Sequence, residues 1–429
     1  MQLLKIVLAC AWFACGAACA QDASSARLIA DYNSAYRALG MAQLALPYQD
    51  NMAALLKETD VAFQRSLFEQ FGRRLKALDV QAASACQQLD LKRIGFEIGI
   101  NQDKLALVER FKALGAQAVL GDQGLYAMPM GREWYLYWLK RWLTSDVTPD
   151  QLSAFGEAEL DAVLARYRRL QEKMGYAGRD QEFYTFLSGP QFLYPRGQTP
   201  RADYEAKQAI VFRNLDKLFL PNAIAPALIR ESGRGAAFPA DGYYDGGTFY
   251  FNQAKAGYGR RNLDMLMLHE SVPGHHYQSN YARVSDACVE GAPYVFYSAF
   301  AEGWGAYVEE FGAQLGLYQQ PADELGAVEW DLVRSIRVVL DVGINYRGWS
   351  RAQAFDYWHA KLPMLPELAE REITRVRNWP AQAITYKYGA DVFRKLRAAE
   401  QARLGTAFDI RVFHDQMLRN GAVPLALLQ

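Results

Sequence analysis

Three of the five histidines in this chain fall within eight residues, from His269 to His276, and Glu270 directly follows the first of them. Histidine is the commonest nitrogen ligand for zinc, and a His-Glu pair is half of the metallopeptidase motif H-E-x-x-H. In that motif both histidines stand on one helix, but here Pro273 occupies the position of the second ligand. The sequence therefore predicts a metal site with Glu270 as general base and with a different ligand spacing.

The remaining histidines can share a metal with His269 only if the helix is interrupted. On a regular helix His275 would lie about 240° round the axis from His269, and His276 would lie about 10.5 Å further along it. Pro273 has no N–H to donate and disfavours the α conformation of the residue before it. Gly274 can adopt conformations that redirect the chain. We therefore expect a kink that returns His275 or His276 to His269.

A third ligand is expected on a helix-like segment at 298–311. Its apolar stripe consists of Phe300, Trp304, Tyr307 and Phe311. Glu302 lies off that stripe, with Glu309 on the same face two turns later. Gly303 and Gly305 each cost a helix about 1 kcal/mol relative to Ala. That cost is easier to explain if another backbone or a metal site approaches closely. A lone Glu on a helix is more often a solvated charge, but beside the histidine cluster we predict Glu302 as a ligand.

The elements that must position these groups are mainly helical. Gly and Pro are sparse over 22–120, where apolar residues recur at helical spacing. Thr148 is a typical helix cap, and Asn262 is a plausible cap for an apolar helix over 263–270. The segment 248–252 predicts one short strand, which could pair with an extended peptide backbone. The fold class is therefore a large, mainly α protein with a small β element just before the His-Glu helix.

Composition and targeting signals narrow the class of protein. Lys plus Arg equals Asp plus Glu at 47 each, so no strong field attracts nucleic acid or an anionic membrane. Residues 1–20 are typical of a secretory signal peptide, which predicts export, with the periplasm as destination. A lipid anchor at Cys19 is the weaker alternative, and no later stretch predicts a transmembrane anchor. Cys86 and Cys288 could form a disulfide or remain two separate thiols.

These motifs resemble a family known as DUF885, which is related to gluzincin metallopeptidases. The resemblance rests on H-E-x-x-P-G-H-x-x-Q from His269 to Gln278 and on E-G-W-x-x-Y-x-E from Glu302 to Glu309. Further stretches that fit are 131–135, 152–157, 379–389 and 413–425. In the family pattern the position of His276 varies, so the resemblance favours His275 as the ligand.

The resemblance implies a helical fold with a deep cleft, like that of related metallocarboxypeptidases and dipeptidases. One zinc ion would be held by His269, His275 and Glu302. Glu270 would accept the proton of the metal-bound water and pass it to the leaving amine. Tyr386, or failing it Tyr388, would stabilise the developing oxyanion, although both could belong to an aromatic packing cluster.

Other candidates are less specific. The candidates for substrate binding are Arg337, Asn345, Gln382 and Tyr388. His276 and Glu309 are candidates for residues that contact the metal ligands without binding the metal themselves. The family often has His where this chain has Asn345, which cannot be cationic. Arg334, Arg337 or Arg347 could bind a peptide carboxylate, although each alone is more often a surface or ion-pair residue. His359 and His414 are interpreted as structural.

The sequence thus predicts an exported zinc peptidase that acts on peptides and does not bind nucleic acid. An N-terminal helical region at 21–230 and a metal-binding region at 231–429 would pack as one unit. Two alternatives remain: an inactive relative that binds metal or peptide, which Asn345 favours, and a metallohydrolase of non-peptide amides or esters. An intact Glu270 favours catalysis, because a pure binding site needs no base.

Overall fold

The structure is a computed structural model that describes residues 23–40, 45–57, 60–115, 124–195, 197–235, 240–253, 258–285, 288 and 296–428. The chain divides into two compact units. Unit 1 comprises 1–119 and 288–296, and unit 2 comprises 120–287 and 297–429. The expected boundary at residue 230 does not coincide with this division. The predicted signal peptide at 1–20, with Cys19, lies outside the described residues.

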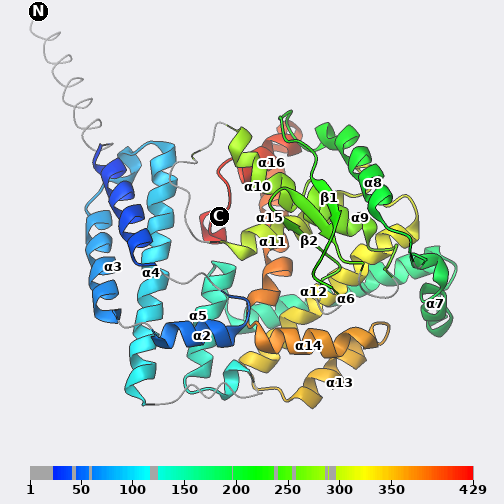
Figure 1. The fold of residues 1–429 in the computed structure, drawn as a ribbon, viewed down its shortest axis with the longest axis horizontal. Helices are drawn as coiled ribbons and strands as arrows, with labels where there is room; N and C mark the ends of the chain where they lie inside the picture. Colours follow the sequence, from blue (N-terminus) through cyan, green and yellow to red (C-terminus); the bar gives the residue numbers. More distant parts are fainter. Residues whose placement is uncertain are drawn as a thin grey trace, which may run out of the picture. The chain divides into compact units, whose positions relative to one another are not determined.

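Unit 1 is helical in its described part (Figure 1). Its helices are 23–38, α2 (Tyr48–Lys57), α3 (Val61–Lys76) and α4 (Ala85–Ala113). The stripe on α3 buries Phe68 and Phe71, and the Tyr32 ring meets Phe71 edge-on. Cys86, in the first turn of α4, forms a disulfide with Cys288. Of the two alternatives for Cys86 and Cys288, the structure therefore has the disulfide, and the bond lies within this unit.

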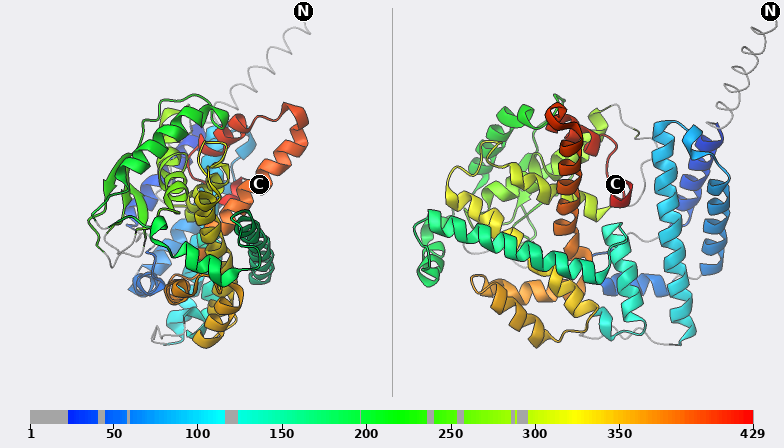
Figure 2. Two further views of the ribbon diagram at one scale, coloured as in Figure 1. Left: turned by 90° about the vertical axis from the view of Figure 1, so that its right-hand side faces the viewer. Right: turned by 180° about the vertical axis from the view of Figure 1, so that it is seen from behind.

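Unit 2 contains most of the helices (Figure 2). They are α5 (Gly131–Leu143), α6 (Pro149–Lys173), α7 (Asp180–Leu187), α8 (Arg201–Asn214), α9 (Leu263–Leu266), α10 (His275–Val284), α11 (Ser298–Val308), α12 (Pro321–Asn345), α13 (Arg351–Lys361), α14 (Ala369–Asn378), α15 (Thr385–Leu404) and α16 (Ile410–Leu418). Two long pairings organise the unit: α6 lies along α12, and α11 lies along α15. The prediction of a mainly α protein is confirmed. Among the described residues no helix is long and apolar enough to cross a membrane.

The main hydrophobic core of unit 2 lies where α6 and α12 meet α13 and α14. It includes Leu160, Tyr167, Leu332, Ile336, Trp358 and Ile373, all of them nearly inaccessible to solvent. The start of α6 follows the local prediction, because Thr148 and Gln151 form a reciprocal capping box with Pro149 in the first turn. The buried face of α12 therefore sets the position of the polar residues on its other side.

A small three-stranded sheet precedes the histidine segment. Its strands β1 (Leu228–Glu231), β2 (Gly242–Asp245) and β3 (Thr248–Phe251) have the order β1-β3-β2. β1 pairs with β3 in parallel and β2 pairs with it antiparallel. The predicted strand is β3, and it is central. The expectation that a peptide could pair with this strand is therefore wrong, because both of its edges are already hydrogen-bonded.

The predicted kink occurs in the histidine segment. After α9 the chain forms a π-helical turn at Met267–Ser271, a non-helical segment with a cis Val272–Pro273 bond, and then α10. A Cβ on Gly274 would lie 1.9 Å from the carbonyl oxygen of His269. Only glycine therefore lets α10 start so close to the end of the preceding turn.

Candidate metal centre

Three side chains of unit 2 converge on one point. The Nε2 atoms of His269 and His275 lie 3.4 and 3.2 Å from Oε2 of Glu302. One ligand atom from each residue can be chosen so that all lie within 4.8 Å of one another. His269 comes from the π-helical turn, His275 from the first turn of α10, and Glu302 from α11. This is the trio that the sequence singled out, and its distances suit a single ion.

The interrupted helix explains why His275 faces the trio and His276 does not. The indole N–H of Trp304 donates to the carbonyl of Pro273 at 2.8 Å, which ties the turn to α11. His276, one residue further round α10, lies with Nε2 2.8 Å from the carbonyl oxygen of Ala225 and with its ring against Tyr244. Burial lowers the pKa of His276. Its place is therefore beside the sheet, away from the trio.

Glu309 orients the ring of His269 from behind. Nδ1 of His269 lies 2.8 Å from Oε1 of Glu309, and Nη1 of Arg334 donates to Oε2 of Glu309 at 2.6 Å. An ionised carboxylate can only accept, so Nδ1 keeps a proton and Nε2 is the nitrogen that faces Glu302 and would bind a metal. Carboxylate–histidine pairs of this kind are typical of metal sites. Glu309 thus contacts His269 on the side that faces away from Glu302 and His275.

The two glycines of α11 allow two close approaches that the sequence suggested, one by a residue of the metal site and one by another backbone. A Cβ on Gly305 would lie 2.7 Å from Cε1 of His269, and a Cβ on Gly303 would lie 2.6 Å from Cα of Gly389 on α15. Gly305 therefore makes room for the imidazole, whereas Gly303 lets two helix backbones approach.

The two carboxylates favour positive charge at His269, which a proton supplies in the metal-free trio and a metal ion would supply in its place. Burial alone would lower the pKa of His269, but hydrogen bonds with Glu302 and Glu309 raise it to about 10. Burial opposes ionisation of Glu302, yet its bonds with the two histidines hold its pKa well below the usual range. Two imidazoles and a carboxylate are the donor set of a catalytic zinc site, which keeps a fourth position open. The residues present therefore fit zinc.

Glu270 is half-buried beside the trio. Burial raises its pKa, while His269 and His275 lower it and the carboxylate of Glu302 raises it further. The backbone of Tyr244, on β2, forms a hydrogen bond with the Glu270 side chain. The strand next to the site therefore helps to position the candidate base.

Of the two candidate tyrosines, Tyr386 lies at the site. Its ring lies 6.0 Å from the His269 ring at an interplanar angle of 21°, and its hydroxyl accepts from Arg375 at 3.2 Å. Burial and Glu302 raise the pKa of Tyr386, which keeps its hydroxyl protonated and able to donate. Tyr388 instead shares a hydrogen bond of 2.8 Å with Ser145. It belongs to another face of α15.

The weaker candidates have different surroundings. Asn345 is fully buried and donates to the carbonyl of Val376 at 3.0 Å, which is a structural contact. Gln382 accepts from Arg375 at 3.4 Å, and Arg337 donates to Glu372 at 2.6 Å. Arg347 pairs with Asp150 of α6 and Arg334 with Glu309, so both are committed to carboxylates of the protein.

Sequence reasoning did not single out Arg371 and Arg375. They stand four residues apart on α14, and an arginine on a helix is usually a solvated charge. Only the tertiary structure shows that Arg375, on α14, meets Tyr386, on α15. No local signal could have identified them.

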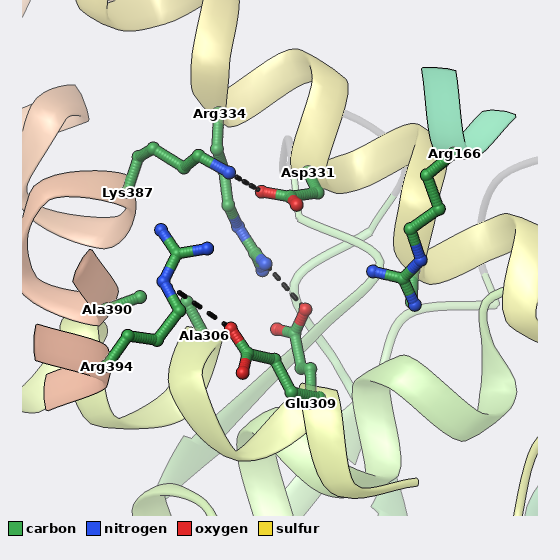
Figure 3. A pocket seen from close by; sticks show the side chains of 10 residues that line it. Arg166, Ala306, Glu309, Asp331, Arg334, Lys387, Ala390 and Arg394 are labelled. Atoms are coloured by element: carbon green, nitrogen blue, oxygen red, sulfur yellow. Dashed lines mark hydrogen bonds and ion pairs between the residues drawn. The ribbon is translucent and has the colours of Figure 1, made fainter. Parts of the chain in front are cut away.

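A polar pocket borders Glu309 (Figure 3). Its charged lining residues are Arg166, Glu309, Glu310, Asp331, Arg334, Lys387 and Arg394. They are joined by ion pairs, such as the pairs of Lys387 with Asp331 and of Arg394 with Glu310. Arg334 itself pairs with Glu309, so the pocket lies behind the carboxylate that contacts His269.

The chain is similar to solved structures along most of its length. It resembles a "putative lipoprotein" from Colwellia psychrerythraea with 25% identity and a TM-score of 0.65, covering 87% of this chain and 66% of that one. A "putative lipoprotein of unknown function" from Shewanella oneidensis has 18% identity and a TM-score of 0.59, with 86% and 71% covered. The chain thus spans about two thirds of the length of the first. No curated protein matches the chain.

A more distant likeness is to Trypanosoma cruzi metallocarboxypeptidase 1, with 12% identity and a TM-score of 0.49, covering 93% of this chain and 91% of that one. At this level the likeness does not bear on function. A family model gives the firmer result, because it matches residues 21–429 and therefore nearly the whole chain. The chain belongs to the family described as bacterial protein of unknown function, DUF885.

Proposed function

We propose that this protein is a zinc-dependent hydrolase of peptide bonds. One observation carries the proposal: His269, His275 and Glu302 present three ligand atoms within 4.8 Å of one another, with the half-buried Glu270 beside them. A zinc ion in that position would act as a Lewis acid and would make hydroxide available near neutral pH. The protein supplies the geometry and the proton transfers.

The residues of the site have distinct roles in this proposal. Glu270 accepts the proton of the attacking water and delivers it to the leaving nitrogen. The Tyr386 hydroxyl donates to the oxygen on which negative charge develops, and the Arg375 donor bonded to it keeps that hydroxyl in place. Glu309 holds His269 in one tautomer.

We also propose that the protein acts outside the cytoplasm. The Cys86–Cys288 disulfide is stable in an oxidising compartment, and two of the similar structures are called putative lipoproteins. Export by the signal peptide at 1–20, or a lipid anchor at Cys19, agrees with both observations.

The test combines metal analysis with turnover. Purified protein should hold about one zinc per chain and should cleave members of a mixed peptide library. Glu270→Gln should keep the metal but lose at least about a hundredfold in kcat, because a positioned base contributes about 10²–10⁴. Failure of carefully reconstituted protein to bind any metal would sink the proposal.

Adjacent histidines supply a matched pair of variants. His275→Ala should abolish stoichiometric zinc binding, whereas His276→Ala should weaken it only modestly, because His276 contacts Ala225 instead of the trio. The reverse order would move the ligand by one residue.

A further inference from the structure

Three arginines of unit 2 surround a single carboxylate. Arg337 Nε donates to Glu372 at 2.6 Å, and Arg371 Nε donates to the same carboxylate at 2.9 Å. Arg375 forms no hydrogen bond or ion pair with a carboxylate among the described residues, and its bonds go to neutral oxygens of Tyr386 and Gln382. Burial lowers the pKa of Arg375, but Tyr386, Glu372 and Glu302 together raise it. Glu372 and Arg337 are both 1% exposed. This arginine cluster, Arg337, Arg371 and Arg375, therefore contains more positive than negative charge.

Two donors of the cluster lack partners. In the part of the chain that the structure describes, Nη2 of Arg337 and Nε of Arg375 are buried without a hydrogen bond. Burial and the nearby Arg375 lower the pKa of Arg337 to about 10, so the fold places this charge where it is not favoured. Buried donor atoms of charged groups that make no hydrogen bond are costly and rare in native structures. An anionic ligand would supply hydrogen-bond acceptors for these two nitrogens.

The cluster lies beside the candidate metal centre. The guanidinium carbons of Arg375 and Arg337 lie 5.5 and 5.9 Å from the centre of the Tyr386 ring, and that ring lies 6.0 Å from His269. Trp330 and Trp379 provide aromatic faces for Arg337 and Arg375 at 5.7 and 4.9 Å. One aromatic ring thus separates the excess positive charge from the metal ligands.

We infer that the arginine cluster binds the free C-terminal carboxylate of the substrate, which would make the protein a carboxypeptidase that removes one or two residues. This inference rests on the proposed function. A guanidinium matches a carboxylate with two parallel N–H donors. An extended peptide advances about 3.3–3.6 Å per residue, so one or two residues beyond the scissile bond bring the terminal carboxylate to the cluster. Arg334, by contrast, is bonded to Glu309 and is not part of the subsite.

The first test compares two matched libraries of N-acetylated tripeptides, one with free C-terminal acids and one with C-terminal amides. The natural protein should cleave the acids at least about a hundredfold faster in kcat/KM, because only a free carboxylate can form charge-assisted hydrogen bonds with the guanidinium groups. Arg375→Gln should reduce this preference at least tenfold, and Arg375→Lys should restore part of it. Arg377→Gln, on the same helix, should retain the full preference.

A binding measurement separates this inference from the proposed function. Isothermal titration with benzoyl-glycyl-phenylalanine and its C-terminal amide, on zinc-loaded and metal-free protein, should show binding of the acid only, with loss in Arg375→Gln. Equal cleavage or equal binding of acids and amides would overturn the inference, even if Glu270-dependent turnover upholds the peptidase. Selective binding of the acid without any turnover would uphold the carboxylate subsite and reject the peptidase.

Discussion

At the scale of single residues, Glu309 fixes which nitrogen of His269 faces His275 and Glu302. Its carboxylate accepts the Nδ1 proton of His269 and is itself held by Arg334. The other nitrogen is thereby committed to the point where His275 and Glu302 converge. Position 309 could be predicted from spacing along one helix, but Arg334, 25 residues later, could not.

His414 shows the structural role that the sequence assigned to it. Its Nδ1 donates to the carbonyl of Leu218 at 2.9 Å, and its Nε2 accepts from the hydroxyl of Tyr307 at 2.9 Å. Arg397 donates to that hydroxyl in turn. The buried imidazole is therefore neutral and satisfied on both sides. Burial lowers the pKa of His414 to about 4.

We predict that His414 makes the protein less stable as pH falls from about 6.5 to about 4. In that range the unfolded state binds a proton at this residue and the folded state does not, so the free energy of unfolding decreases as pH falls. The full effect is at most about 3 kcal/mol. It should be measured by chemical denaturation, followed by tryptophan fluorescence, between pH 7.5 and 4.

His414→Gln should flatten this part of the pH profile. His359→Gln is the control, because that histidine is exposed on α13. If the two variants show the same slope as the natural protein, His414 is not the group responsible.

At the scale of elements, α11 carries the centre because of its two glycines. The apolar stripe of Phe300, Trp304 and Tyr307 is buried as expected, and Glu302 stands off it. α11 and α15 can approach closely only because Gly303 meets Gly389. The same approach brings Tyr386, on α15, against His269, on the π-helical turn.

We predict that Gly305→Ala and Gly303→Ala damage different properties. Gly305→Ala should weaken zinc binding at least tenfold, because its Cβ would displace the His269 ring. Gly303→Ala should lower the free energy of unfolding by about 1–3 kcal/mol, because its Cβ would meet the backbone of α15. Zinc titration and urea denaturation measure the two effects.

Gly99→Ala is the control for both variants. Gly99 is also in a helix, α4, but an added Cβ there would meet nothing within 4 Å. It should leave zinc binding unchanged and should stabilise unit 1 by up to about 1 kcal/mol. Natural zinc affinity in Gly305→Ala would contradict the role given to Gly305.

At the scale of the whole molecule, the candidate site belongs entirely to unit 2. Its ligands, the candidate base, Tyr386 and the arginine cluster all come from that unit. Helix α6, which the sequence assigned to an N-terminal region, packs along α12 and so belongs to the same unit. The disulfide belongs to unit 1, where it joins two cysteines 202 residues apart.

We predict that loss of the disulfide destabilises the protein and leaves the metal site intact. The bond restricts the unfolded chain, and its removal should cost about 2–4 kcal/mol. Reduction should lower the midpoint of thermal unfolding without changing zinc stoichiometry. The double variant Cys86→Ala, Cys288→Ala should show the lower midpoint from the start and should not respond to reductant. Loss of zinc on reduction would refute the separation of the two roles.

The sequence by itself determined the features that depend on local chemistry. Helical periodicity, the cap at Thr148, the break at Pro273 and the trio of His269, His275 and Glu302 were all predicted from residue types, spacing and family motifs. Local rules suffice there, because capping, φ restriction and side-chain periodicity act over a few residues.

Only the tertiary structure decided which distant groups meet. It showed the Cys86–Cys288 bond, the central place of β3, and the approach of Arg375 to Tyr386. Each of these depends on how separate helices and strands pack together, whether they are 202 residues apart, as the two cysteines are, or neighbours in sequence. The sequence of a single segment does not predict this packing, because burial and ion pairing depend on contacts between elements. The convergence of His269, His275 and Glu302 was therefore predictable from the sequence, whereas the proposed carboxylate subsite was not.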